Sequence, residues 1–429
     1  MPAWGGWRDR QRTAGGEETR GGCGHSRVTS VSPNGEARPV PLRALVLLAL
    51  AAFCSSITMR VCDPLLPMIA KDLSATVGET SSIVASYAVG YGLLQLVFGP
   101  VGDRFGKFLV AGACSLATGI ATALASQSGN LDSLIVMRFA AGATAAGLIP
   151  LAFAWIGDMV PFAQRQAVLA RFLSAQISGI ILGQALGGLL GDLFGWRTVF
   201  MIVGLCHVLA GAAILVELRL NPSSQPPLAA RRTGFSGVAA SILDLLRRPW
   251  VRVMLISVGI EGFAYYGAFA YVGADLHHRF GVGFGLIGSV LAAFGIGAII
   301  YSFTARQLLV WLGERGLVLC GGIILSVAFA ALAVAPTVAV VPIIMVMLGL
   351  GFYMFHNTLQ SNATQMAPEA RGLGVSLFAL SLFLGQSLGV ALAAPAVDRL
   401  GVPAIYLAAA VILPAIALWF RSKLAFRPE

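Results

Sequence analysis

Long apolar runs separated by short charged turns are the feature that most constrains this chain. Residues 81–98 and 108–126 are two such runs without a charged side chain, and residues 99–107 lie between them. An apolar run of about 18 to 20 residues is long enough to cross a lipid bilayer as a helix. Because the connection is short and rich in glycine, we expect two antiparallel helices joined by a tight turn.

The same pattern continues along the chain and predicts an integral membrane protein. Of the 429 residues, 57% are hydrophobic and 11% are charged, which is too little charge to cover a water-soluble domain. We expect twelve membrane-spanning helices, six on each side of a basic linker that contains three prolines. The expected spans cover about residues 43–67, 79–99, 107–127, 131–156, 168–191, 199–218, 250–274, 283–305, 316–335, 337–359, 372–395 and 402–421.

The predicted fold is therefore an all-α membrane protein made of two six-helix bundles. We place the bundles at residues 41–218 and 249–429, with the linker at 219–248. Isoleucine and leucine residues within 242–246 favour a short amphipathic helix at the membrane surface. Residues 1–40 are polar and glycine-rich without an apolar period, so we predict a disordered tail.

The distribution of basic residues predicts the orientation. If the N-terminus is inside, 23 of the 29 Lys and Arg residues fall in cytoplasmic segments, and without the tail the ratio is still 16 to 6. We therefore expect both termini in the cytoplasm and the protein in the plasma (inner) membrane. The net charge of +10 is attributed to this orientation and to anionic lipid, and not to nucleic acid.

Several classes of chemistry lack their sequence signatures. The cysteines form no C-x-x-C pair, so we expect no metal and no cofactor. No phosphate-binding G-x-x-x-x-G-K-[ST] motif occurs, so an ion gradient is the expected energy source. A membrane-embedded enzyme is disfavoured because no HExxH motif, histidine-rich cluster or nucleophile elbow is found.

An internal repeat indicates how the two bundles are related. The sequence Leu-Gly-Gln-Ala-Leu-Gly at 182–187 returns as Leu-Gly-Gln-Ser-Leu-Gly at 384–389, in the fifth span of each half. Equivalent positions imply two parallel repeats about an axis along the membrane normal. The glutamine of each copy is expected to pack between helices. The turn 312–316 is similar to 99–107 but lacks the acid that Asp103 supplies.

Four motifs resemble those of the major facilitator superfamily, over about residues 41–421. The turn 99–107 is similar to the signature loop between helices 2 and 3. Residues 138–142 are similar to the Arg-x-x-Gln-Gly element, with Ala141 in place of the usual Gln. Residues 179–188 are similar to the antiporter motif of helix 5, with Gln184 in place of its proline. Pro64-Leu-Leu-Pro resembles the end of helix 1 in the drug–proton antiporter branch with twelve spans.

The resemblance implies a conformational role for the helix 2–3 turn and for helix 5. In the family the turn forms an inside contact between the halves that must break before the protein opens inward. An ordinary charged loop that only fixes topology is the alternative. The residues concerned are Gly99, Asp103, Arg104, Gly106, Lys107, Gly183 and Gly187.

Arg138 and Asp63 are candidates for proton coupling. Arg138 lies roughly 10 Å into the fourth span, where an unpaired charge is costly, so it should face a cavity or a partner. Asp63 at the outer end of the first span is the expected partner. In the alternative, Arg60 and Asp63 only extend to the outer interface and anchor the first helix.

Glu261 is the third candidate for proton coupling. It lies roughly 13 Å into the seventh span, and no basic residue of that span stands at i±3 or i±4. A carboxyl group in such surroundings can bind and release a proton during each transport cycle. The alternative is a protonated glutamic acid that only forms a hydrogen bond to a neighbouring helix.

Polar and aromatic residues of spans 7 and 10 are the expected substrate contacts, because such groups tend to face the interior of a bundle. They are Tyr265, Tyr266, Tyr353, His356, Asn357 and Gln360. His356 could instead be neutral and only hydrogen-bonded. His207 in span 6 is expected to be structural.

Together these features predict a monomeric, proton-coupled secondary transporter that exports small organic molecules by alternating access. Its expected partners are a small-molecule substrate, protons and the bilayer. A proton symporter or facilitator for uptake of a sugar or metabolite, or a sensor that has lost transport, are the alternatives that the sequence leaves open.

Overall fold

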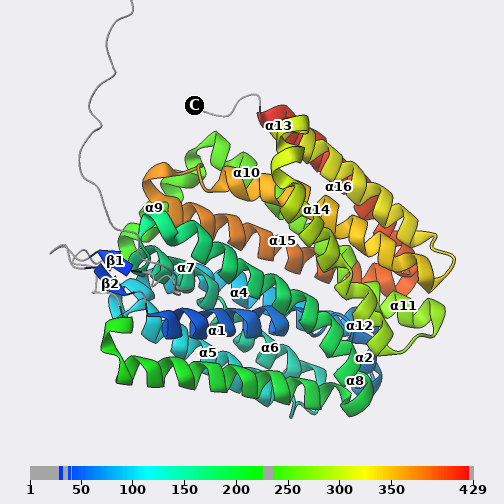
Figure 1. The fold of residues 1–429 in the computed structure, drawn as a ribbon. Helices are drawn as coiled ribbons and strands as arrows, with labels where there is room; N and C mark the ends of the chain where they lie inside the picture. Colours follow the sequence, from blue (N-terminus) through cyan, green and yellow to red (C-terminus); the bar gives the residue numbers. More distant parts are fainter. Residues whose placement is uncertain (1–28, 32–36, 40, 226–234, 425–429) are drawn as a thin grey trace, which may run out of the picture.

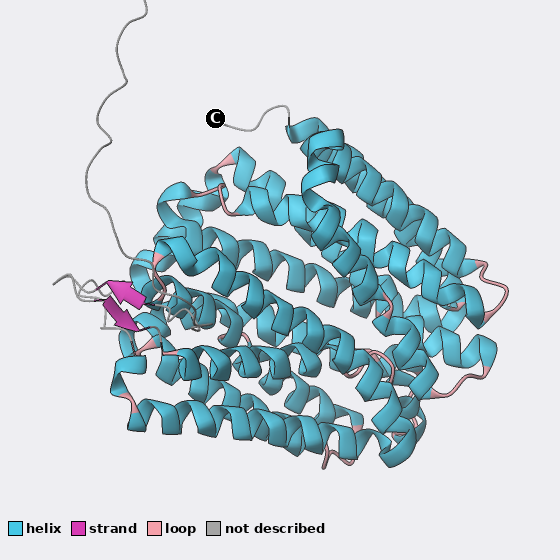
Figure 2. Cartoon of the chain, in the orientation of Figure 1, coloured by secondary structure: helices cyan, strands magenta, loops and turns pink. Residues whose placement is uncertain are grey.

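The computed structural model describes residues 29–31, 37–39, 41–225 and 235–424, and these are almost entirely helical (Figures 1 and 2). The N-terminal half contains α1 (Leu42–Arg60), α2 (Leu66–Asp72), α3 (Val77–Thr80), α4 (Ser82–Phe105), α5 (Lys107–Ala125), α6 (Leu131–Ala145), α7 (Leu148–Met159) and α8 (Phe162–Leu220).

The second half follows a connection that contains η1 (Pro222–Ser224) and α9 (Phe235–Arg247). It comprises α10 (Pro249–Phe269), α11 (Val272–Phe280), α12 (Phe284–Ala292), α13 (Phe294–Ala333), η2 (Val338–Val340), α14 (Val341–Ala363), η3 (Pro368–Ala370), α15 (Arg371–Leu400) and α16 (Val402–Lys423). In Figure 1, α9 and the start of α1 lie at one end of the molecule, which we call the linker end. The opposite end, with α2, α11 and α12, is the far end.

Twelve membrane crossings account for the helices of the described residues. Ten helical stretches are long and apolar enough to span a bilayer. Two of them, Gln164–Leu220 and Phe284–Ala333, are twice the usual length and reverse direction at Gly195 and Gly313, where the backbone is not helical. Each therefore provides two crossings, which agrees with the predicted six-plus-six arrangement.

Glycines with positive φ form the reversing turns at equivalent places in the two halves. At the linker end these are Gly106, with φ of 104°, and Gly313, with φ of 63°. At the far end they are Gly195, with φ of 79°, and Gly401, with φ of 80°. Only glycine adopts such conformations without strain, so the turn positions repeat together with the fold.

The crossings pack as two bundles that meet along two seams. Within the first bundle α8 packs on α1 and α5, and within the second α10 packs on α15 and α13 on α14 and α16. Between the bundles, α4 lies against α15 and α8 against α12 (Figure 1). These two contacts are equivalent under the internal repeat, as expected for parallel repeats about one axis.

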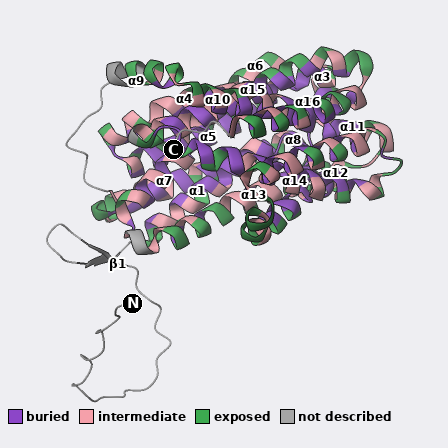
Figure 3. Cartoon of the chain, turned by 90° about the horizontal axis from the view of Figure 1, so that it is seen from above, coloured by how far each residue is buried: buried purple, intermediate pink, exposed green. Residues whose placement is uncertain are grey.

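The surface is apolar where the helices face outward. Figure 3 shows buried residues in the interior and exposed residues along the outer flanks of the helices. Among the exposed side chains are Phe303, 82% exposed, and Trp311, 77% exposed. Apolar surface of this extent is costly in water but suits the hydrocarbon of a bilayer.

Some expected elements differ in detail. The fourth span is broken at residues 146–147, between α6 and α7, and the seventh at 270–271, between α10 and α11. The amphipathic helix expected near 242–246 is confirmed as α9, with Leu245 buried and Leu243 55% exposed.

The N-terminal tail shows a further difference. Its described residues form two antiparallel strands, β1 (Thr29–Val31) and β2 (Ala37–Pro39), so the prediction of no regular structure is wrong for these six residues. The prediction rested on the absence of an apolar period, and strands of three residues are too short to show one. The remaining residues of the tail, and Arg231 and Arg232 of the linker, lie outside the described residues.

Candidate functional site

A cavity of about 1910 Å³ lies between the two bundles and extends to the linker end. Its lining comes from both halves. The N-terminal half contributes Gln95, Gly99, Asp103 and Lys107, the C-terminal half contributes His356, Gln360, Arg371 and Lys423, and the linker contributes Arg248. The lysines and arginines mark the linker end, while Gln95 and His356 lie deeper along α4 and α14.

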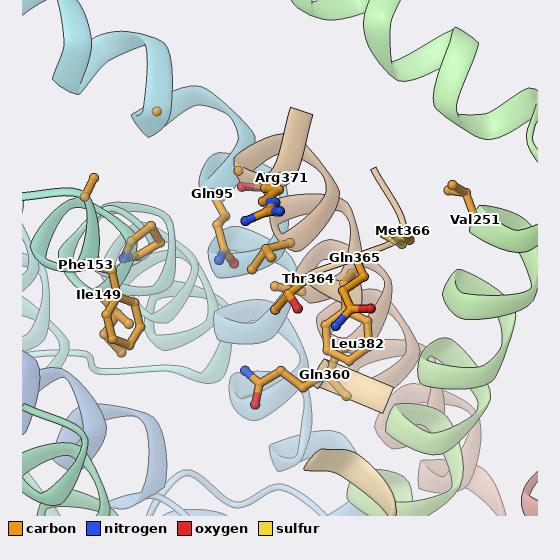
Figure 4. A pocket seen from close by; sticks show the side chains of 18 of the residues that line it. Gln95, Ile149, Phe153, Val251, Gln360, Thr364, Gln365, Met366, Arg371 and Leu382 are labelled. Carbon is orange, nitrogen blue, oxygen red and sulfur yellow. The ribbon is translucent and has the colours of Figure 1, made fainter. Parts of the chain in front are cut away.

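The walls of the cavity differ in polarity. Ile149 and Phe153 of α7 form an apolar wall on one side (Figure 4). Gln360 and Thr364, near the end of α14, and Arg371, at the start of α15, lie on the other side together with Gln95. The Oε1 atom of Gln95 is buried and has no hydrogen-bond partner among the described residues. An amphipathic organic molecule with a hydrogen-bond donor would complement these walls.

Glu261 and His356 form a hydrogen-bonded pair at the wall of the cavity. Nδ1 of His356 lies 2.9 Å from Oε2 of Glu261, and the two residues come from α10 and α14. Glu261 is 0% exposed, and its Oε1 has no partner among the described residues. His356 lines the cavity, so it separates the carboxyl group from the open space. The sequence pointed to both residues but not to their contact.

Four of the six expected substrate contacts do not line this cavity, and their role in binding substrate stays a prediction. Among the described residues, only His356 and Gln360 of the six line the cavity. Tyr265, 1% exposed, packs on Phe352 with ring centroids 4.5 Å apart, and Tyr353 contacts the same ring.

The other two of the four are Tyr266 and Asn357. The guanidinium of Arg60 lies over the ring of Tyr266, 4.5 Å from the ring centroid. Asn357 lies on α14 next to His356 and is partly buried. Large rings fill a core at least as readily as they line a pocket, and residue type alone does not distinguish the two.

Asp63 pairs with Arg60 and not with Arg138. Nη1 of Arg60 lies 3.7 Å from Oδ2 of Asp63, and the Gln184 amide donates to the same oxygen at 3.4 Å. Both members of the ion pair are buried, so the alternative that they only extend to the interface is wrong. Arg60 is on the N-terminal half and Tyr266 on the C-terminal half, so this cluster also connects the bundles.

Arg138 is stabilised by backbone carbonyls. Its Nη1 donates to the carbonyl of Thr58 at 3.2 Å and its Nε to that of Ile83 at 3.5 Å. The guanidinium also lies 4.3 Å from the ring centroid of Tyr87. Arg138 does face a partner, as predicted, but the partner is not Asp63. It consists of backbone carbonyls of α1 and α4 and of an aromatic ring.

His207 belongs to the same polar cluster, which the sequence did not indicate. Its Nε2 lies 3.1 Å from Oγ1 of Thr58, and its Nδ1 lies 3.2 Å from Oγ of Ser115. Since the Thr58 hydroxyl donates to the carbonyl of Cys54, it accepts from Nε2–H of His207. In the sequence His207 is a single histidine within an apolar span, and nothing near it indicates which residues of other helices it contacts.

The helix 2–3 turn forms a small ion-pair network within the N-terminal half. Lys107 lies 2.5 Å from Asp158 of α7 and 3.4 Å from Asp103. Arg104 lies over the ring of Phe105. Gly106 provides the positive φ of the turn. Within the part of the chain that the structure describes, the ion pairs of this turn join α4, α5 and α7, and none crosses to the other half.

Gly183 and Gly187 allow α8 to approach α1 closely. A Cβ atom added at Gly183 would lie 2.9 Å from Cα of Ile57, and one at Gly187 would lie 3.0 Å from Val61. The next glycine, Gly188, faces the other half, where a Cβ would lie 2.1 Å from the carbonyl oxygen of Phe284. Packing this tight closes the α8–α12 seam toward the far end.

Two six-helix bundles around a central cavity define a membrane transporter fold. A family model described as Major Facilitator Superfamily matches residues 48–390, and the chain belongs to this family. It is therefore a member of a transporter family and not of an enzyme family.

The curated relatives are transporters and resistance proteins. The uncharacterised MFS-type transporter YwfA of Bacillus subtilis is 26% identical over 374 residues, 87% of this chain and 90% of its own. A chloramphenicol resistance protein of Streptomyces lividans is 25% identical over 83% of this chain and 88% of its own. A lincomycin resistance protein of Streptomyces lincolnensis is 29% identical over 43% of this chain and 38% of its own.

Solved structures share the fold at low identity. A bacterial homologue of the human lysosomal transporter Spinster, described as inward-facing and occupied, has a TM-score of 0.73 at 18% identity and covers 92% of this chain and 100% of its own. The nucleoside transporter NupG has a TM-score of 0.70 at 11% identity and covers 90% of this chain and 99% of its own.

Proposed function

We propose that this protein is a proton-coupled secondary transporter that exports small organic molecules by alternating access. The observation that carries the proposal is the cavity between the bundles, which extends to the linker end and has His356, hydrogen-bonded to the buried Glu261, in its wall. Rocking of one bundle against the other would expose the same cavity to the opposite side.

The Glu261–His356 pair supports the proton-coupled part. His356 lines the cavity and holds Glu261 by a hydrogen bond, so a proton can pass from the cavity to the carboxyl group through the imidazole. Protonation of Glu261 changes this hydrogen bond and, with it, the hydrogen-bonding groups that the imidazole offers to a substrate. Coupling follows if proton and substrate favour opposite-facing states.

The lining supports an amphipathic substrate. Phe153 and Ile149 provide an apolar wall, and Gln95 and Gln360 provide hydrogen-bonding groups. Two relatives carry names of resistance to antibiotics, chloramphenicol and lincomycin, which agrees with export as the direction of transport.

The proposal includes orientation and moving parts. The excess of basic residues in the tail, the linker and the turns of the linker end supports a cytoplasmic linker end in a plasma membrane. Residues 41–218 and 249–429 would be the two moving units of a monomer, connected by residues 219–248.

The test is the external pH of de-energised right-side-out vesicles when each compound of a panel is added. Vesicles carry the wild type, Glu261→Gln, or Glu217→Gln. Glu217 is a second buried glutamate, on α8, with its carboxylate hydrogen-bonded to Asn221 and outside the cavity lining. Uptake of the compound is measured in the same samples.

We expect external acidification with the wild type and Glu217→Gln and none with Glu261→Gln. Acidification means that substrate enters as protons leave, which is antiport. External alkalinisation would instead establish symport, and uptake without a pH change would establish facilitation. A pH response that survives in Glu261→Gln would exclude Glu261 as the coupling group.

A further inference from the structure

Two aspartates at the far end each hold a helix start of the opposite half. Asp192, near the end of the fifth crossing in α8, accepts hydrogen bonds from the backbone N–H of Phe284 at 3.0 Å and of Gly285 at 2.5 Å. These amides are the first of α12, so they have no acceptor within their own helix. The carboxylate therefore connects the N-terminal half to the C-terminal half.

Asp398 forms the equivalent contact in the other direction. It lies near the end of the eleventh crossing in α15 and accepts from the Thr76 hydroxyl at 2.8 Å and from the backbone N–H of Gly78 at 3.1 Å. Thr76 is the N-cap of α3 and is held in place by a capping box with Glu79. This carboxylate connects the C-terminal half to the N-terminal half.

The two aspartates occupy the same position in the repeat. Each stands three residues before a turn glycine with positive φ, Gly195 for Asp192 and Gly401 for Asp398. A carboxylate in the last turn of a helix is disfavoured by the helix dipole. The hydrogen bonds to the other half offset this unfavourable interaction. The aspartates therefore stabilise the contact between the bundles and not the helices on which they lie.

We propose that the contacts of Asp192 and Asp398 help to hold the far end shut while the cavity is open at the linker end. Both must break when the bundles rock, because each joins a residue of one half to a helix start of the other. This role rests on the alternating access proposed above. In this role the two residues favour the state that is open at the linker end over the state that is open at the far end.

Glycine at the donating position lets the Asp398 carboxylate approach the backbone N–H of Gly78. A Cβ atom at Gly78 would lie 2.4 Å from Oδ2 of Asp398 and 2.7 Å from the carbonyl oxygen of Ala394. A methyl group there would push the halves apart, although alanine is the better helix former. Gly78→Ala thus weakens the contact without removing a charge.

The test measures the separation of the halves at the far end by pulsed EPR on the purified protein. Spin labels are placed on Gln127 and Thr337, two exposed residues in far-end turns of the two halves. The variants are Asp192→Ala, Asp398→Ala and both together. The matched control is Asp132→Ala, an exposed acid in the first turn of α6 at the same end.

We expect the double variant to raise the ratio of long to short distances by roughly tenfold over the wild type, because charge-assisted hydrogen bonds are lost. Each single variant should give a smaller increase. A distance distribution of the double variant that equals that of Asp132→Ala would overturn the proposal.

A second comparison covers the case in which the aspartate variants do not fold. Gly78→Ala is compared with Gly129→Ala, a far-end glycine whose added Cβ would meet nothing within 4 Å. The fraction of molecules with the longer label-to-label distance should increase only in Gly78→Ala. Equal distance distributions of Gly78→Ala and Gly129→Ala would contradict the proposal. Because this measurement needs neither substrate nor proton gradient, its failure is distinct from a failure of the transport assay.

Discussion

At the scale of single residues, the sequence located buried charges more readily than their partners. Glu261 and Arg138 stand out because each is a charge inside an apolar run. Their partners, His356 and the carbonyl of Thr58, lie on other helices. Many polar groups lie at suitable depths, so which of them meets the charge depends on helix rotation and tilt.

A residue-scale prediction concerns Asp72, at the end of α2 outside the membrane-spanning helices. Hydrogen bonds from Arg197 and from Trp196 lower the pKa of Asp72 below its usual 3.8. An acid with a lowered pKa stabilises the folded state above its unfolded pKa, and this stabilisation is lost as the pH falls through the lowered value.

We therefore expect Asp72→Asn to lower the free energy of unfolding at pH 7 by at most about 1 kcal/mol, since the pair is partly exposed. The difference from wild type should shrink below about pH 4. Thermal unfolding in detergent between pH 7 and pH 3.5 measures this difference in stability, with Asp132→Asn as the control. A difference independent of pH would show that the ion pair is not its cause.

At the scale of helices, glycine decides how closely neighbours approach. In the second half, a Cβ atom at Gly385 would lie 2.0 Å from the carbonyl oxygen of Gly259, and one at Gly389 would lie 2.1 Å from that of Phe263. Gly183 and Gly187 approach α1 in the first half. The glycines of the repeated sequence thus have the same packing role in both bundles.

This packing gives a prediction for Gly385→Ala. The added methyl group should destabilise the protein by about 1–3 kcal/mol, because α10 and α15 must separate. Gly372→Ala on the same helix is the matched control, since an added Cβ there meets nothing within 4 Å. Denaturation in detergent compares the two variants. Equal stability would contradict the assigned role of Gly385.

Some features of the elements could be predicted and others could not. The helix reversals at Gly106 and Gly195 follow from glycine and charge between apolar runs. The break between α6 and α7 at residues 146–147 was not expected, because the apolar run continues through it. Hydropathy measures length and polarity, but not the helical geometry within an apolar run.

At the scale of the whole molecule, the cavity depends on how the bundles meet. Ala379 of α15 lines it, while Ala391 of the same helix is exposed. We expect Ala379→Trp to fill part of the space and to lower transport strongly, with little change in thermal stability. Ala391→Trp should leave both unchanged. Substrate uptake by vesicles and melting temperature check this pair, and equal uptake by both variants would place the transport path elsewhere.

The amino-acid sequence by itself determined the membrane location, the number of crossings and their division into two repeats. These follow from apolar length and from glycine and charge in the turns, which are local properties. Only the tertiary structure decided that Glu261 meets His356, that Asp63 pairs with Arg60, and that Tyr265 packs in a core. The physical reason is that these contacts depend on the rotation of each helix and on the relative placement of the two bundles, which a uniformly apolar sequence does not encode locally.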